Sequence, residues 1–146
     1  MTLTFKKLRE EAKIPTAATR LSAGLDLYAC IPAPVTINPG ESFNFPTGIA
    51  VCPDDENVVM LIFVRSGHGV KHCLTLPNSV GVIDSDYRGE ISVPIINLGH
   101  EPYTMQPGER FAQLVTVPVL FPDTAVADSL PETERGTAGF GSSGRL

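Results

Sequence analysis

Apolar and polar residues alternate over short stretches of the chain, and most stretches end at a glycine, a proline or a charged turn. The stretches that predict strands are 2–8, 23–31, 32–41, 41–51, 57–66, 70–76, 79–83, 91–98 and 109–120. The run VVMLIFV at 58–64 is continuously apolar, which predicts a strand buried on both faces. Pro94 predicts a sheet edge or a bulge. Short strands with turns every eight to twelve residues or so predict an all-β fold, a jelly-roll-like double sheet or distorted barrel.

The content of glycine and proline supports this prediction. The chain of 146 residues has 13 glycines and 13 prolines, and the longest interval without proline, 54–76, contains Gly67 and Gly69. These residues disfavour long helices, so a helical bundle is excluded. The hydrophobic fraction of 42% and the mean hydropathy of +0.10 are ordinary for one packed core.

The periodic pattern ends near Pro122. Residues 122–146 are polar and rich in glycine and serine, and too few of them are apolar for the segment to order itself. We expect 1–121 to form the barrel and 122–146 a flexible, Gly-rich C-terminal arm. Such an arm is either a frayed terminus or a segment that wraps a ligand, because glycine lets the backbone approach phosphate closely.

Charge and cysteine content narrow the class of protein. Eleven basic and 16 acidic residues give a net charge of −5, so we expect no broad surface for nucleic acid or anionic lipid. The three cysteines, Cys30, Cys52 and Cys73, have no C-x-x-C spacing, and the N-terminus lacks the apolar region of a signal peptide. No stretch approaches the length of a membrane span. We therefore expect a cytoplasmic protein.

Four clusters of polar residues interrupt the strands, at 23–27, 65–67, 81–90 and 108–114. The third, GVIDSDYRGE, is the most informative, because Tyr87 is costly on a bare hairpin tip and Asp84 beside it is able to orient a water. A solvated charged tip remains the alternative. Arg110, in the fourth cluster, is expected to pair with neighbours of Glu109 or with the arm. His68 is expected to be exposed and idle, and the alternative is that it senses pH or the phosphates.

The ordered set AGLDL, RSG, GVIDSDYRGE, GERFAQL and RGTAGFGSSG resembles the five motifs of the trimeric dUTPases. The motifs extend from Ala23 to Gly144 and so span 122 of the 146 residues. The resemblance implies hydrolysis of dUTP to dUMP and pyrophosphate by attack of water on the α-phosphorus. Leu25, His68 and Ala138 depart from the residues usual in the family.

The resemblance also assigns roles in recognising the nucleoside. Asp84 is implied to activate the attacking water, since an aspartate in water is ionised at pH 7 and able to accept a proton. Tyr87 is implied to lie under the deoxyribose and exclude a ribose 2′-hydroxyl. Asn78 and the hairpin of Gly81, Val82 and Ile83 are implied to pair with the uracil edge.

For the triphosphate, the resemblance implies contacts from Arg65, Ser66 and Gly67 to the α- and β-phosphates, with Gln113 contributing. The implied cofactor is Mg²⁺, held mainly by the triphosphate. Asp26 is implied to lie near the water shell of the metal and to hold charges such as that of Arg65 in place. A chain with a charge of −5 repels a triphosphate at long range, so binding has to depend on local donors, a metal and an ordering arm.

The arm is implied to close over the substrate from a neighbouring subunit of a homotrimer. The arm residues implied to contact the substrate are Arg135, Phe140, Gly141, Ser142 and Ser143. In this picture 1–121 is the catalytic domain and 122–146 is the closing arm.

Three other functions remain open at this stage. A dCTP deaminase-like enzyme would share the fold and would release ammonia from dCTP. A regulatory module would bind dUTP tightly without turnover. A structural, capsid-like jelly roll would be indifferent to nucleotides.

Overall fold

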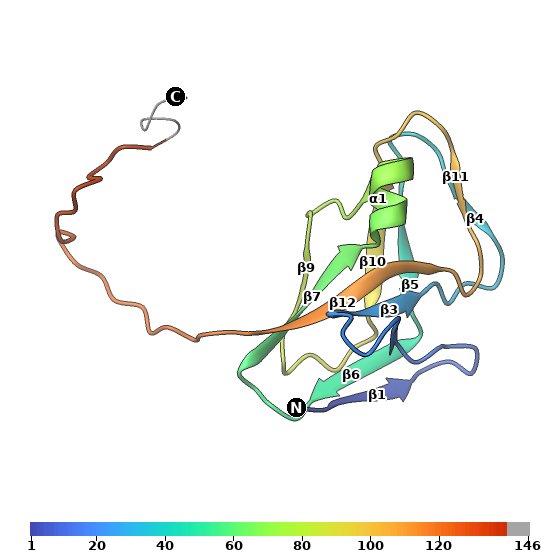
Figure 1. Cartoon of the computed structure of the whole chain (residues 1–146), viewed down its shortest axis with the longest axis horizontal. Helices are drawn as coiled ribbons and strands as arrows, with labels where there is room; N and C mark the ends of the chain where they lie inside the picture. Colours follow the sequence, from blue (N-terminus) through green and yellow to red (C-terminus); the bar gives the residue numbers. More distant parts are fainter. Residues whose placement is uncertain (140–146) are drawn as a thin grey trace.

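A computed structural model of the whole chain describes residues 1–139 (Figure 1). It confirms a mostly β fold, with a short helix at the end of one strand. The elements are β1 (Leu3–Lys7), β2 (Thr16–Ala17), β3 (Gly24–Tyr28), β4 (Val35–Ile37), β5 (Ser42–Pro46), β6 (Ile49–Pro53), β7 (Val58–Val64), α1 (Ser66–His72), β8 (Leu74–Thr75), β9 (Gly81–Ile83), β10 (Ser92–Asn97), β11 (Tyr103–Met105) and β12 (Arg110–Pro118).

The largest sheet has five strands in the order β2-β3-β12-β7-β9. Smaller sheets are formed by β5-β10-β8, β1-β6 and β11-β4, and the pairings in all four sheets are antiparallel. The strand β12, which is the last strand along the chain, lies between β3 and β7. Residues that are far apart in sequence therefore become neighbours in this sheet.

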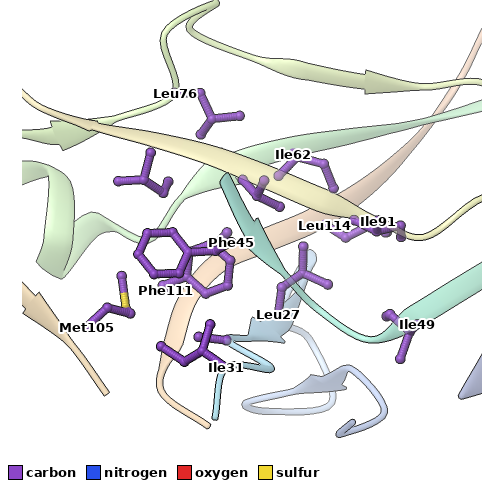
Figure 2. Close-up of a cluster of buried hydrophobic side chains, with 14 of the residues drawn as sticks. Leu27, Ile31, Phe45, Ile49, Ile62, Leu76, Ile91, Met105, Phe111 and Leu114 are labelled. Carbon is purple, nitrogen blue, oxygen red and sulfur yellow. The ribbon is translucent and has the colours of Figure 1, made fainter. Parts of the chain in front are cut away.

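The core lies between the sheets and is built from alternate residues of the strands. Phe45 and Phe111 are fully buried, with ring centroids 5.4 Å apart, and Figure 2 shows them among aliphatic side chains such as Leu27 and Ile62. These four side chains come from β5, β12, β3 and β7. The core therefore fixes the five-stranded sheet against the sheet β5-β10-β8.

The predicted strand at 70–76 is wrong. Residues 66–72 form α1, and only Leu74 and Thr75 form a strand, β8. The N–H groups of His68 and Gly69 both donate to the carbonyl of Arg65 at 3.0 Å and begin the helix. Two glycines in seven residues hide this helix from propensity arguments, because glycine disfavours helices. Cys73 ends it in the left-handed conformation, at φ 53°.

Three further details differ from the prediction. The stretch 41–51 is two strands of different sheets, β5 and β6, separated at Gly48, whose φ of 71° a side chain would strain. The strand β7 alternates between buried and half-buried residues, so it is not buried equally on both faces. The short strands β2 and β11 lie outside the predicted stretches. The prediction for Pro94 agrees with the structure. Pro94 pairs with Asn44 of β5 on one side, and on the other side β8 pairs only with Ile96 and Asn97, so Pro94 lies at a sheet edge.

Beyond β12 the chain leaves the barrel and extends away from it (Figure 1). Residues 119–139 contain no strand or helix, and nearly all of them are exposed. Within residues 1–139, no helix has the length and apolar character needed to cross a membrane.

Candidate active site

The register of the large sheet brings three polar residues together around Asp26 of β3. Gln113 of β12 lies opposite Asp26, and the same Gln113 lies opposite Phe63 of β7, two residues before Arg65. Residues directly opposite one another project from the same face of a sheet. We call Asp26, Arg65, Arg110 and Gln113 the Asp26 cluster.

Two guanidinium groups hold the Asp26 carboxylate. Arg65 Nε lies 2.9 Å from Asp26 Oδ1, and Arg110 Nη1 lies 3.1 Å from Asp26 Oδ2. The Asp26 side chain is 10% exposed, whereas those of Arg65 and Arg110 are 32% and 49% exposed. One carboxylate and two guanidinium groups leave a formal charge of +1, and each guanidinium keeps N–H donors that an anion can use.

Arg110 reaches Asp26 because β12 is irregular at its start. The register shifts between Arg110 and Ala112, so that Phe111 is an extra residue in the strand. In a regular strand, positions 110 and 113 would project from opposite faces. The bulge re-aims Arg110 and places it beside Asp26. In residues 1–139 Arg110 thus pairs with Asp26 rather than with neighbours of Glu109, and its predicted pairing with the arm stays a prediction.

Gly24 makes room for Gln113. A Cβ atom at Gly24 would lie 3.2 Å from Gln113 Cβ and closer still to its amide oxygen. Ser66 and Gly67, the first residues of α1, are exposed directly after Arg65. The structure thus brings the predicted residues Asp26, Arg65, Ser66, Gly67 and Gln113 to one region.

A second group of predicted residues lines a pocket of about 180 Å³ beside β9. Its walls include Asn78, Gly81, Val82 and Ile83, and its floor includes Ile62 of β7. A Cβ atom at Gly81 would lie 3.0 Å from Ile62 Cβ, so the two strands approach closely there. We call this cavity the hairpin pocket. It is smaller than pockets that hold whole drug-sized ligands, and its size suits a single ring.

Asp84 follows β9 and is exposed in a wide cleft of about 1140 Å³. Five carboxylates line this cleft and only one arginine does; the charged residues are Asp54, Asp55, Glu56, Asp84, Asp86 and Arg88. Tyr87 lies on the same loop, 43% exposed, and its hydroxyl donates to the carbonyl of Glu90 at 3.1 Å. A triphosphate would meet repulsion in this cleft unless cations came from elsewhere.

The Asp26 cluster and Asp84 lie at opposite ends of β7. Ile83 pairs with Met60 near the start of β7, whereas Arg65 follows its last residue, Val64. Five residues of strand span about 17 Å at 3.3 Å per residue. The backbones that carry the two groups in one chain are thus separated by much more than a hydrogen-bond distance.

The arm residues are only partly described. Arg135 is exposed, and its Nε donates to the carbonyl of Ala138 at 3.0 Å. Phe140, Gly141, Ser142 and Ser143 lie outside the described residues.

Comparison with known proteins decides the family. The model of the dUTPase family matches residues 10–144, which is nearly the whole chain. The chain belongs to the dUTPase family. It is similar to the deoxyuridine 5′-triphosphate nucleotidohydrolase of Coxiella burnetii, at 49% identity over 96% of this chain and 92% of the relative. It is also similar to that of Aromatoleum aromaticum, at 50% identity over 90% and 88% of the two chains.

Solved dUTPase structures share the fold. A mutant dUTPase of Staphylococcus bacteriophage 80alpha with dUpNHpp superposes with a TM-score of 0.87 and 29% identity, covering 98% of each chain. A mutant dUTPase from phage phi11 of S. aureus, described with a structural Mg(II) ion, superposes with a TM-score of 0.79 and 25% identity, covering 88% of this chain and 98% of that chain.

In this dUTPase, His68 is neither exposed nor idle, and the prediction for it is wrong. The residue is 8% exposed, and its Nε2 lies 2.8 Å from Glu109 Oε1 and 3.1 Å from the Tyr103 hydroxyl oxygen. The Tyr103 hydroxyl also donates a short hydrogen bond to Glu109 Oε1. Burial alone would raise the pKa of the Glu109 carboxyl, but hydrogen bonds from Tyr103, Gln106 N–H and His68 outweigh it and lower that pKa below its ordinary value. Burial and the bond to Glu109 raise the pKa of Tyr103.

Sequence reasoning missed Arg110, Tyr103 and Glu109 as partners at this site of the dUTPase. Arg110 and Glu109 lie inside the motif GERFAQL, so their place in this motif could have indicated that they belong to the site. Tyr103 carries no sequence signal, because it lies in a short strand that the pattern did not predict.

Proposed function

We propose that this chain hydrolyses dUTP to dUMP and pyrophosphate, with Asp84 as the base and the Asp26 cluster as a phosphate-binding group. The observation that carries this proposal is the arrangement of the dUTPase motif residues. One set lines a ring-sized pocket next to an exposed carboxylate, and the other forms a cationic cluster with spare donors.

The hairpin pocket would take the uracil ring. Its wall contains the backbone of β9 and the amide of Asn78, which supply donors and acceptors for a base edge. Its apolar part, including Ile62 and Leu76, would contact the ring faces. Tyr87, on the loop that follows, would lie against the deoxyribose.

The Asp26 cluster, with Ser66 and Gly67, would bind the α- and β-phosphates. Arg65 and Arg110 have fixed orientations because each donates to the same carboxylate. Guanidinium groups held in this way present parallel N–H donors to phosphate oxygens without further reorganisation. Gln113, on the same face of the sheet, would donate its amide.

Asp84 would accept a proton from the attacking water. The water oxygen forms a bond to the α-phosphorus while the bond from that phosphorus to the oxygen bridging the β-phosphate breaks. The electron pair of that bond leaves with pyrophosphate, and the proton of the water passes to the Asp84 carboxylate. No side chain of residues 1–139 hydrogen-bonds the Asp84 carboxylate, so it has free lone pairs for a water.

The donor set fits Mg²⁺ bound through the substrate. Residues 1–139 hold no group of three or more His, Cys, Asp or Glu side chains that would make a protein cage for a metal. Mg²⁺ usually keeps several waters and binds through substrate phosphates with one or two carboxylates. When bound, it neutralises phosphate charge and orients the leaving group. Both oxygens of Asp26 accept from arginines, so a contact of Asp26 through the water shell fits better than direct coordination.

The site would be shared among the chains of a homotrimer. The separation of Arg65 and Asp84, about 17 Å along β7, supports a site in which these residues act on one substrate from different chains. Residues 122–146 would form the closing arm of the catalytic domain 1–121. The described part of this arm, 122–139, extends away from the barrel, which suits contact with a neighbour (Figure 1). Arg135, Phe140, Gly141, Ser142 and Ser143 would complete the site. The free thiols Cys30, Cys52 and Cys73 support a cytoplasmic setting.

Pyrophosphate release from a panel of deoxynucleotides and UTP, with and without Mg²⁺, tests the proposal. We expect release from dUTP alone. Asp84→Asn should lower kcat by about 10²- to 10⁴-fold, the usual contribution of a general base, while binding of dUTP persists. The control is Glu56→Gln, the same chemical change in another carboxylate of the cleft, which should leave kcat unchanged.

Near-normal turnover in Asp84→Asn would remove Asp84 from the mechanism. Ammonia released from dCTP would replace the proposed reaction with a deamination. Tight dUTP binding without pyrophosphate would indicate a regulatory module.

A further inference from the structure

Three side chains that the proposed mechanism does not use meet beneath α1. His68 comes from α1, Tyr103 from β11 and Glu109 from the residue before β12. The His68 side chain is 10% exposed and that of Glu109 is 22% exposed, and the His68 and Tyr103 ring centroids are 5.4 Å apart. Polar groups buried together in this way stabilise one arrangement of the segments that carry them.

The hydrogens of this group follow from its chemistry. The Glu109 carboxylate is ionised and accepts only, and its Oε1 accepts from the Tyr103 hydroxyl. His68 Nε2, at 2.8 Å from the same oxygen, must therefore carry a hydrogen. The other oxygen, Oε2, accepts the N–H of Gln106 at 2.8 Å. The carboxylate is thus fixed at both oxygens, and it fixes the helix through His68.

The same helix carries the phosphate-binding residues. Arg65 precedes α1, and its N–H donates to the carbonyl of Phe111 at 3.0 Å while its Nη1 donates to the carbonyl of Arg110 at 3.2 Å. His68 donates its own N–H to the carbonyl of Arg65. The first turn of α1 and residues 109–111 are therefore joined by backbone and by side chain. The bond from His68 to Glu109 is the buried side-chain part of this junction.

We propose that His68, Tyr103 and Glu109 are positioning residues that hold the first turn of α1 on the start of β12 and so set the placement of Arg65 and Arg110 for the triphosphate. This proposal rests on the proposed function. None of the three residues touches the substrate. Their effect should be strongest on the phosphates, because they join α1 directly to the start of β12. The hairpin pocket lies beside β9, where Gly81 is opposite Ile62, and Asp84 lies near the start of β7.

Calorimetric Kd values for a non-hydrolysable dUTP analogue and for dUMP test it, measured on the full-length protein with Mg²⁺. His68→Leu removes the donor and keeps apolar bulk. We expect its affinity for the triphosphate analogue to fall about tenfold and its affinity for dUMP, which keeps only the α-phosphate, to fall less, by about two- to threefold. Tyr103→Phe keeps the ring and should fold in any case. In this variant the Kd for the analogue divided by the Kd for dUMP should rise, as it does in His68→Leu. His68→Gln should restore the ratio, because its amide nitrogen reaches the position of Nε2.

Val70→Ala is the matched control, since Val70 lies in the same helix with 83% of its surface exposed. It should leave both affinities unchanged. Equal losses for the analogue and dUMP in His68→Leu and Tyr103→Phe, or no loss, would overturn the proposal, as would a His68→Gln variant that behaves like His68→Leu. If the unaltered protein released no pyrophosphate from dUTP, the proposed function would fail, and the Kd ratios would still judge the positioning role.

Discussion

At the residue scale, Gly89 occupies a motif position where the Tyr87 ring leaves no space for a side chain. A Cβ atom at Gly89 would lie 3.0 Å from Tyr87 Cε2 and would overlap the hydroxyl end of that ring. The ring thus packs over the glycine while its hydroxyl bonds to the carbonyl of Glu90. Since Tyr87 is 43% exposed, the ring is free to swing outward if this space is filled. Gly89 therefore controls the orientation of Tyr87 more than the stability of the barrel.

We predict that Gly89→Ala displaces the Tyr87 ring and weakens the selection of dUTP over UTP. The ratio of kcat/KM values for the two nucleotides should fall about tenfold, which corresponds to about 1.4 kcal/mol. Tyr87→Phe keeps the ring over Gly89 and should leave the ratio within about twofold. An unchanged ratio in Gly89→Ala would show that Tyr87 does not exclude the 2′-hydroxyl.

At the scale of elements, the turn from β11 into β12 depends on an ionised carboxylate. Glu109 accepts from Gln106 N–H within the turn and from Tyr103 and His68 outside it. These bonds favour the charged form of Glu109 in the folded chain and lower its pKa below the ordinary value of 4.5. The folded chain therefore binds fewer protons at this position than the unfolded chain.

This sign gives a pH dependence of stability. The contribution of Glu109 is fully present above pH 4.5 and is lost as the pH falls through the lower folded-state pKa. In thermal unfolding below pH 4.5, the Tm of the unaltered protein should fall more steeply than that of Glu109→Gln. Glu101→Gln, an exposed carboxylate before β11, should follow the unaltered protein. Parallel pH profiles for Glu109→Gln and the unaltered protein would contradict this assignment.

At the scale of the whole molecule, one chain holds two incomplete halves of the proposed site. The cationic half lies at the end of β7, whereas the other half lies along β9, from the hairpin pocket beside Ile62 to Asp84 near the start of β7. The cleft around Asp84 is acidic, so in the proposed mechanism cations from another chain would have to offset its charge before a triphosphate could enter. Assembly would then be a requirement for activity.

We predict that two inactive variants complement each other. Asp84→Asn and Arg65→Ala should each be inactive alone. When both are co-expressed, chains mix in a symmetric oligomer, and about a quarter of the shared sites should receive an intact Asp84 from one chain and an intact Arg65 from another. Pyrophosphate release from purified mixed oligomers measures this recovery. Each variant expressed by itself is the control. A mixture as inactive as its components would place both residues in a site within one chain.

Much of the fold and of the candidate site could be predicted from the sequence. The strands at 3–7, 24–28, 58–64, 92–97 and 110–118 fall within predicted stretches, because alternation and turn residues are local properties. The family followed from five ordered motifs, and the roles of Asp84, Tyr87 and the arm residues stay predictions. The helix α1 could not be predicted, because two glycines oppose it locally and contacts of Arg65 and His68 with residues 109–111 hold it in place.

The sequence by itself determined most of the turns, the mostly β character of the fold, and which residues belong to the dUTPase motifs. Only the tertiary structure decided that Arg110 binds Asp26, that His68 is buried against Glu109, and that Arg65 and Asp84 lie at opposite ends of one strand. The reason is physical. Turns and alternation arise from neighbouring residues, whereas these contacts depend on strand register and on the bulge at Phe111, which join residues 41 to 84 positions apart.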